Sequence, residues 1–185
     1  DAVLEDAAEM GLKVVRTWGN LDAGVKTDKV SDKGYTVFTD SVDGSGEKEG
    51  VYYQYFDADL GRPVVNEGED GLQKLDYALY KAEQEGIKLL ITFTNNWEAF
   101  GGMGQYVQWA KLAGENVSGN DDFYTNETIK GWYKDYIKTL LNHENVYTGV
   151  KYKDDPTIFS WELANEPRCE SDAGCENNTV VKWAT

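Results

Sequence analysis

Residues 161–169, with the sequence WELANEPRC, hold the side chains of this chain that are best suited to chemistry. They place Glu166 beside Asn165 and Pro167, at the end of an apolar run. A carboxylic acid in such a position is suited to general acid–base catalysis. The alternative is a structural glutamate in a salt bridge, for which Arg168 is the nearest candidate partner. We favour the catalytic interpretation because Glu166 follows a strand and stands beside both Asn165 and Pro167.

The alternation of side chains along this strand predicts which residues share a face. One face carries smaller and polar residues, which we expect to point into the fold with Glu166 at its mouth. The other carries larger apolar residues, which we expect to face the surrounding helices. The first set is Ser160, Glu162, Ala164 and Glu166, and the second is Phe159, Trp161 and Leu163. Asn165 has the opposite parity, so it reaches the same site only if the strand bends at its end, which Pro167 favours.

The composition excludes several other kinds of chemistry. The chain has 33 acidic and 18 basic side chains and a net charge of −15, whereas binding nucleic-acid phosphates needs a basic surface. One histidine and two cysteines are too few for a thiolate or imidazole metal site, so we expect no metal and no other cofactor. A catalytic serine or cysteine that is activated by a histidine would have to use His143, the single histidine of the chain. The longest apolar run, residues 89–93, is far shorter than the ~18 residues of a membrane span, so we expect no membrane partner.

Aromatic residues are unusually frequent. Six tryptophans and twelve tyrosines exceed what a core of this size needs, and several lie in polar, glycine-rich surroundings. Aromatic faces with polar neighbours suit sugar rings, whose C–H groups stack on them while their hydroxyls form hydrogen bonds. The alternative is that these are ordinary core and surface residues, and both interpretations are open at this point. For Trp109 and Trp132, which lie in helical patterns, we favour a place in the core.

Two features favour secretion into an oxidising, extracellular compartment. Three glycosylation sequons begin at Asn116, Asn126 and Asn177, slightly more than the roughly one expected by chance. Cys169 and Cys175 are close enough in the sequence to form a small disulfide loop, with two free thiols as the alternative. Because we find no signal peptide, we expect the chain to be processed or partial.

Helical and strand-like patterns alternate along the chain. We expect strands at residues 12–18, 87–94 and 157–165, and helices at residues 2–10, 72–82, 129–141 and 179–184. Gly11 and Gly86 follow the first two helices and can adopt the left-handed conformation that ends a helix. Thr125 is the expected N-cap of the third helix. The alternation argues for a parallel sheet built from βαβ units.

The loop lengths indicate where a site lies. About fifty residues follow the first strand and about thirty follow the second, and such insertions at strand ends are where α/β enzymes build their sites. No phosphate-binding glycine motif follows a strand, which weakens a nucleotide-binding fold. A whole (β/α)8 TIM barrel needs ~250 residues. The alternation without a nucleotide motif favours part of such a barrel, and we therefore expect residues 1–185 to be one domain that forms about half of an α/β barrel.

Several segments resemble glycoside hydrolase family 5, and within it the fungal and plant endo-β-1,4-mannanases. Asn165-Glu166-Pro167 after an apolar strand is similar to the acid/base segment of the (β/α)8 barrels of that family. Further similar blocks follow in family order over nearly the whole chain: VVRTWG at 14–19, NNWEAFGG at 95–102, QYVQWA at 105–110, YTGV at 147–150 and DDPTI at 154–158. Asn-Glu-Pro alone is a weak signal, whereas these blocks together identify the chain as a member of the family.

The resemblance implies three catalytic roles. Glu166 protonates the leaving glycosidic oxygen and later activates water, as the acid/base of a retaining mechanism. Asn165 hydrogen-bonds the 2-hydroxyl of the sugar that is cleaved. Arg16 holds the nucleophilic carboxylate in its ionised form, and a salt bridge remote from the site is the alternative for this residue.

The resemblance also implies substrate contacts. Trp18 and Trp97, in the loops after the first two strands, are candidate platforms for sugar rings, and Asn96 is expected to bind substrate beside them. Arg168 is expected to bind the leaving side of the mannan chain. Loop packing is the alternative for Trp97, and pairing with a nearby carboxylate is the alternative for Arg168.

The activity that the resemblance implies is the retaining endo-hydrolysis of β-1,4-mannosidic linkages in mannan, glucomannan or galactomannan. No segment of this chain matches the first strand of the family, so the resemblance implies a partial (β/α)8 catalytic domain over residues 1–185, about the first half of the barrel with its first strand missing. No residue of this chain matches the nucleophile either, so we expect it to lie outside the chain and the chain alone to be inactive. We expect a polysaccharide partner and a monomer when the protein is complete. The alternatives are another family 5 β-glycanase, an exo-mannosidase, or a non-catalytic carbohydrate-binding barrel.

Overall fold

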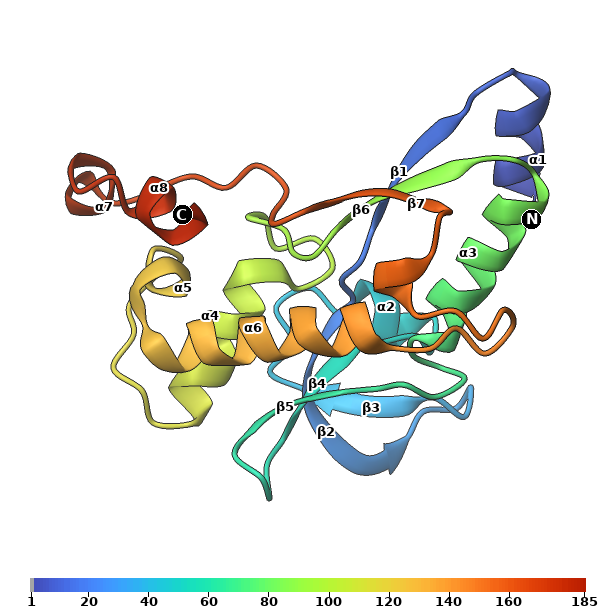
Figure 1. The fold of residues 1–185 in the computed structure, drawn as a ribbon. Coiled ribbons are helices and arrows are strands. Elements are labelled where there is room, and N and C mark those ends of the chain that lie inside the picture. The colour runs from blue at the N-terminus through green and yellow to red at the C-terminus, as the bar shows by residue number, and fades with distance from the viewer. Residues whose placement is uncertain (1) are drawn as a thin grey trace.

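A three-stranded parallel sheet organises the fold in the computed structural model, which describes residues 2–185 (Figure 1). Its strands are β1 (Val14–Trp18), β6 (Lys88–Thr92) and β7 (Ile158–Glu162), paired in the order β1–β6–β7. A helical segment precedes each strand: α1 (Ala2–Glu9), α3 (Gln73–Gln84) and the short 3₁₀ helix η1 (Tyr152–Asp154). The alternation of helix and parallel strand predicted from the sequence is confirmed.

Five further helices lie in the connection from β6 to β7 and after β7. They are α4 (Gly102–Leu112), α5 (Asp122–Thr125), α6 (Glu127–Asn142), α7 (Asp172–Glu176) and α8 (Thr179–Ala184). Figure 1 shows α7 and α8 at one end of the molecule, next to α5. Trp183 of α8 packs there against Phe123 and Tyr124 of α5, at ring-centroid distances of 5.7 and 5.3 Å. The segment after β7 is therefore anchored on α5.

The helix ends follow the predicted signals in two cases and depart from them in one. Gly11 and Gly86 adopt φ angles of +79° and +65°, the left-handed conformation expected after a helix. The N-cap of α6 is Asn126 and not Thr125, which lies in α5. Asn126 has an extended backbone, and its side chain accepts a hydrogen bond from Ile129 N at 3.0 Å, so the asparagine amide oxygen satisfies this helix end.

The register of the sheet brings the carboxyl ends of the three strands to one edge. Trp18 pairs with Thr92, and Thr92 pairs with Glu162. The predicted third strand was too long, because β7 ends at Glu162. One further bridge joins Asn95 to Asn165 beyond the strand ends. The two loops that follow β6 and β7 are thus held side by side by backbone pairing.

The long connection after β1 forms a second sheet that the sequence patterns did not predict. It contains β2 (Asp22–Val30), β3 (Thr36–Thr39), β4 (Gln54–Asp57) and β5 (Arg62–Val65), in the order β3–β2–β4–β5, with the short helix α2 (Ser45–Lys48). Three of these strands have only four residues, and β2 has four charged residues among its nine, so none shows a clear apolar pattern of a strand. The sheet lies below the parallel sheet in Figure 1.

The core lies among the helices and the parallel sheet. Its largest fully buried side chain is Trp109 of α4, followed by Tyr106 of the same helix and Tyr136 of α6. Burial of Trp109 confirms its predicted place in the core, and Trp132 of α6 packs against the same cluster from a partly buried position. Burial of such large side chains supplies much of the apolar area that stabilises a fold.

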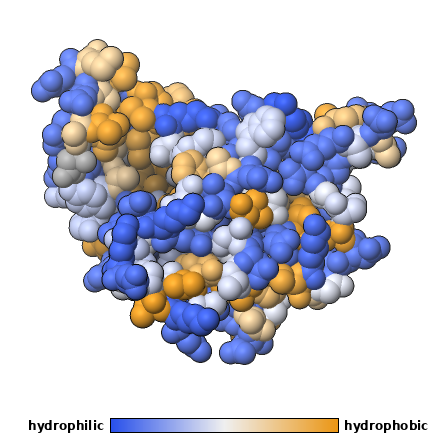
Figure 2. All heavy atoms as spheres, turned by 180° about the vertical axis from the view of Figure 1, so that it is seen from behind, coloured by the Kyte–Doolittle hydropathy of each residue, from blue (hydrophilic) through white to orange (hydrophobic). Residues whose placement is uncertain are grey.

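Apolar side chains also remain exposed at the open edges of the parallel sheet. Around α1 and β1 they form a hydrophobic area, at the upper left of Figure 2, that includes Val3, Met10, Leu12 and Val14. Phe159 on β7 and Leu163 directly after it, which we expected to face helices, are 59% and 45% exposed among the described residues. Only Trp161 of that set packs inward, stacked on Phe93 at 4.7 Å. Both edges of the sheet thus present apolar surface that a closed barrel buries.

A buried ionic cluster joins α3 to the end of α6. His143, the C-cap of α6, has Nδ1 at 2.9 Å from Glu67 Oε2 and Nε2 at 3.0 Å from Asp76 Oδ1. The hydroxyl of Tyr152 also donates to Asp76 Oδ1, at 2.6 Å. Burial alone lowers the pKa of His143, but its bonds to Asp76 and Glu67 outweigh this effect and raise the pKa above the ordinary 6.5. His143 is thus part of the framework.

Among residues 2–185, none of the helices has both the length and the apolar character needed to cross a membrane.

Candidate active site

Glu166 lies four residues beyond β7, where the backbone turns sharply. Its φ of +46° is a left-handed value that is unusual for a residue other than glycine, and such strain often occurs at functional sites. Its carboxylate oxygen Oε2 accepts a hydrogen bond from Trp97 Nε1 at 2.9 Å and another from Arg168 Nη2 at 2.8 Å. The side chain is 54% exposed. The bend therefore presents an accessible carboxylate that two donors hold through one oxygen.

Arg16 connects the first and last strands of the parallel sheet. Its Nε and Nη2 atoms donate to Glu162 Oε2 at 2.9 and 2.6 Å, and Nη2 also donates to Asn165 Oδ1 at 2.9 Å. Strand alternation gave Glu162 and Asn165 opposite parity. They meet at the same guanidinium because β7 ends at Glu162 and the chain bends after it, as predicted.

Asn95 links the loop after β6 to this group. Its Oδ1 accepts from Asn165 Nδ2 at 2.9 Å and from the backbone N–H of Trp97 at 3.2 Å. Its Nδ2 donates to the carbonyl of Ala99 at 3.1 Å. The amide of Asn165 is therefore held at both ends, with Oδ1 facing Arg16 and Nδ2 facing Asn95.

Two arginine–tryptophan pairs lie at the site, one against Glu166 and one beside Asn165. The guanidinium carbon of Arg168 lies 4.7 Å from the ring centre of Trp97, and that of Arg16 lies 5.6 Å from the ring centre of Trp18. Trp97 is 48% exposed, whereas Trp18 is partly buried against Phe100 at 5.6 Å. A cationic and an aromatic side chain therefore contact Glu166 in a chain that is acidic overall.

One predicted substrate contact is not supported by its position. The side chain of Asn96 is 1% exposed, and within residues 2–185 neither its Nδ2 nor its Oδ1 has a hydrogen-bond partner. Its neighbour Asn95 instead joins the group around Asn165. Glu162 was not predicted to be a site residue, although its place on the polar face of the strand, which it shares with Glu166, indicated that it lies near the site. Side chains that follow each other in a loop point in different directions, so sequence alone does not choose between Asn95 and Asn96.

A buried aspartate supports the loops that carry the two tryptophans. The backbone N–H of Asp22 donates to Phe100 O at 2.9 Å, and its carboxylate accepts from Gly102 N at 3.1 Å and Gln54 Nε2 at 2.8 Å. Burial raises the pKa of Asp22 from 3.8 to about 7, although hydrogen bonds from Gln54, Asn20 and Gly102 oppose the rise. This aspartate therefore ties the loop after β1 to the loop after β6.

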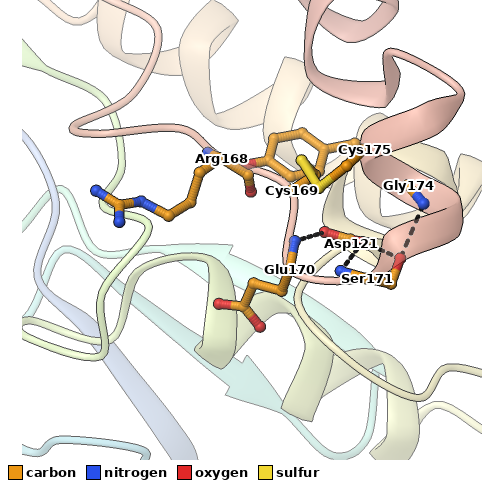
Figure 3. Close-up of a disulfide and its surroundings, with 8 residues drawn as sticks. Asp121, Arg168, Cys169, Glu170, Ser171, Gly174 and Cys175 are labelled. Carbon is orange, nitrogen blue, oxygen red and sulfur yellow. Dashed lines mark hydrogen bonds between the residues drawn. A yellow bond between two sulfur atoms is a disulfide. The ribbon is translucent and has the colours of Figure 1, made fainter.

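The predicted disulfide is present. Cys169 and Cys175 are bonded, with their Cα atoms 5.2 Å apart, directly after Arg168 (Figure 3). The closed loop joins the residues after the strand end to α7.

Within residues 2–185, no group of three or more histidine, cysteine, aspartate or glutamate side chains is arranged to hold a metal ion. The chemistry that this arrangement offers is proton exchange at the Glu166 carboxylate, next to aromatic surface and to hydrogen-bonding groups at Asn165 and Arg168.

A family model described as GH family 5 beta-mannosidase-like matches residues 58–185. Mannan endo-1,4-beta-mannosidase 3 of Arabidopsis thaliana is 39% identical over 181 residues, which cover 98% of this chain and 36% of that protein. Mannan endo-1,4-beta-mannosidase 1 of Oryza sativa subsp. japonica is 37% identical over 184 residues, covering 100% of this chain and 35% of that protein. The chain thus spans about a third of the length of these relatives.

Solved structures show the same fold. An endo-1,4-beta-mannanase from Rhizomucor miehei has a TM-score of 0.77 and 38% identity, covering 98% of this chain and 45% of that one. A hyperthermostable endo-1,4-beta-D-mannanase from Thermotoga petrophila has a TM-score of 0.68 and 40% identity, and the match covers 98% of this chain and 44% of that one. These likenesses confirm that the described residues form part of a (β/α)8 barrel, and these residues do not form a closed barrel themselves.

Proposed function

Because the chain belongs to glycoside hydrolase family 5, in its β-mannosidase-like group, we propose that residues 1–185 are part of the catalytic domain of a retaining endo-β-1,4-mannanase. The substrate is a β-mannan polysaccharide: mannan, glucomannan or galactomannan. The proposal is supported by the names of relatives 37–39% identical over nearly the whole chain. The observation that carries it is Glu166, an accessible carboxylate at a strand end among Trp97, Arg168 and Asn165.

Glu166 acts first as an acid and then as a base. Its protonated carboxyl donates to the glycosidic oxygen while a second carboxylate attacks the anomeric carbon, which gives a glycosyl–enzyme and a shortened chain. The ionised Glu166 then takes a proton from water as the water attacks the same carbon, which frees the nucleophile and restores the acid. Trp97 and Arg168 both bind Oε2, so Oε1 is the oxygen that exchanges the proton.

Asn165 and Arg16 orient the groups around the reacting carbon. Asn165 hydrogen-bonds the 2-hydroxyl of the sugar, a contact that strengthens as positive charge develops on the ring. The fixed orientation of its amide between Arg16 and Asn95 supports this role, because a preorganised group needs no rearrangement during the reaction. The Nε and Nη2 atoms of Arg16 donate hydrogen bonds to Glu162 and Asn165. Its Nη1 atom is left to bind the nucleophilic carboxylate, which another part of the barrel contributes.

Trp18 and Trp97 supply aromatic surface for sugar rings, and Arg168 contacts the leaving side of the polysaccharide. The protein works outside the cell as a monomer. The disulfide between Cys169 and Cys175 supports the extracellular assignment, since such bonds persist in oxidising compartments.

The test uses the full-length protein that contains this chain. We expect reducing ends to be released from mannan and not from carboxymethylcellulose, and Glu166→Gln to lower turnover by about 10³-fold or more. Azide should restore turnover of activated aryl glycosides by Glu166→Gln, because an anion then replaces the water that lacks its base. Glu98→Gln, an exposed glutamate in a nearby loop, is the matched control and should retain full activity.

Three outcomes would overturn this proposal. Faster cleavage of carboxymethylcellulose would favour another β-glycanase, and release of single mannose units from chain ends would favour an exo-mannosidase. Binding of mannan with no hydrolysis under any condition would favour a non-catalytic carbohydrate-binding barrel.

A further inference from the structure

Tyr124, on the short helix α5, holds the backbone of Arg168. Its hydroxyl donates to the carbonyl of Arg168 at 3.2 Å and accepts from the N–H of the same residue at 3.1 Å. Tyr124 is 3% exposed, and its ring packs on Trp183. A single buried hydroxyl therefore satisfies both backbone groups of one exposed arginine.

Asp121, just before α5, holds Glu170 and Ser171, which lie two and three residues after Arg168. Its Oδ1 accepts from the N–H of Glu170 at 2.8 Å, and its Oδ2 accepts from the N–H of Ser171 at 2.9 Å and from the Ser171 hydroxyl (Figure 3). Burial tends to raise the pKa of Asp121, but these hydrogen bonds outweigh it and lower the pKa, so the carboxylate stays charged. A Cβ on Gly174 would lie 2.3 Å from Asp121 Oδ2, so glycine is required for this close approach.

The disulfide does not replace this attachment. It joins Cys169 to Cys175, and both residues belong to the segment that follows Glu166. It stiffens that segment internally, whereas Tyr124 and Asp121 fasten it to the rest of the barrel. In Figure 3 the Arg168 side chain points away from the disulfide. It extends to Trp97 and Glu166, so the position of its guanidinium depends on where its backbone is held.

We propose that Tyr124 is a positioning residue that places the Arg168 guanidinium against Trp97 and Glu166, with Asp121 as its support. The inference rests on the proposed function, in which Arg168 contacts the leaving side of the mannan chain. Tyr124 would fix the position from which Arg168 makes that contact. Tyr124 touches no substrate. It acts through the backbone of Arg168, which a tyrosine hydroxyl can hold as both donor and acceptor.

The test compares Tyr124→Phe with Tyr133→Phe in the full-length protein. Tyr133 is an equally buried tyrosine whose hydroxyl also donates to a backbone carbonyl near the same strand end, that of Leu163, and it does not contact Arg168. Both changes remove one buried hydroxyl, so both should lower the melting temperature. With mannopentaose as substrate, Tyr124→Phe should raise KM about tenfold with kcat within about threefold, and Tyr133→Phe should change KM less than about twofold.

A double-mutant cycle with Arg168→Ala shows whether Tyr124 acts through the arginine. In the Arg168→Ala background, Tyr124→Phe should change KM less than about twofold, because the group that it positions is gone. Asp121→Asn is the second variant, in case Tyr124→Phe folds poorly, and should raise KM in the same direction by a smaller factor.

Two results would overturn the inference. One is a KM of Tyr124→Phe and of Asp121→Asn equal to that of the wild type, and the other is an equal rise in KM with and without Arg168. A wild-type protein that does not hydrolyse mannan would instead overturn the proposed function, so the two failures are distinguishable.

Discussion

Arg16 and Asn165 are 149 positions apart in the sequence, yet Arg16 Nη2 donates to Asn165 Oδ1 at 2.9 Å. The bond spans the carboxyl end of β6, because β1 and β7 pair with opposite sides of that strand. The other side of the Asn165 amide is held by Asn95. The orientation of an amide that we propose contacts the sugar therefore depends on residues from three strand ends.

Replacing Arg16 with lysine should impair this arrangement without unfolding the protein. A lysine ammonium is a point charge and does not reproduce the planar fork that binds Glu162 and Asn165 together. We expect kcat on mannan to fall by about 10–100-fold. The unfolding midpoint should change little, because the Arg16 and Glu162 side chains are 43% and 34% exposed and such pairs contribute at most about 1 kcal/mol. Arg62→Lys on β5 is the matched control, and equal activity of the two variants would contradict the role of Arg16.

Replacing Trp97 with phenylalanine separates its two contacts. The phenyl ring still offers a face to Arg168 but has no N–H for Glu166 Oε2. We expect kcat/KM on mannan to fall about fivefold, equivalent to one hydrogen bond of about 1 kcal/mol. Trp97→Ala removes the ring as well and should lower kcat/KM on mannan about tenfold further. Trp132→Phe on α6 serves as control. If Trp97→Phe matches the wild type in kcat/KM, the hydrogen bond to Glu166 has no part in turnover.

Replacing both Cys169 and Cys175 with serine should lower the free energy of unfolding by about 2 kcal/mol. This is the contribution expected when so short a closed loop restricts the entropy of the unfolded chain. Denaturant unfolding measures this change, and thiol titration of the denatured, unreduced wild type should find neither cysteine free. Because Tyr124 and Asp121 remain in place, KM for mannopentaose should rise less than in Tyr124→Phe. A KM higher than that of Tyr124→Phe would mean that the disulfide, and not α5, positions the loop.

His143 should make stability depend on pH. Its pKa is raised in the folded protein, so its contribution is fully present below pH ~6.5, the unfolded value, and is lost as the pH rises through the folded pKa. We expect His143→Gln to lower the free energy of unfolding by about 2 kcal/mol at pH 5.5, the size of a hydrogen bond to a charged group. The difference should shrink by pH 9. Urea unfolding at both pH values measures it, and a difference independent of pH would show that His143 is not charged when folded.

The alternation of helices with the three parallel strands and the main candidate for catalysis could be predicted from the sequence because both depend on local patterns. Apolar periodicity marked the three parallel strands, and the glycines at positions 11 and 86 marked two helix ends. The position of Glu166 after a strand, and the short spacing of Cys169 and Cys175, needed no knowledge of distant residues. Trp109 was recognisable as a core residue from its place in an apolar helical pattern.

The contacts that make a site of these residues were decided by the tertiary structure. The pairing of Arg16 with Glu162, the choice of Asn95 over Asn96, and the attachment of Arg168 to Tyr124 all join segments far apart in the chain. Each depends on the register of β1, β6 and β7 and on the bend at Glu166, where strict alternation ends. Side-chain periodicity describes a regular strand or helix only, so it stops being informative at the strand ends, where the chain leaves the sheet and the site is built.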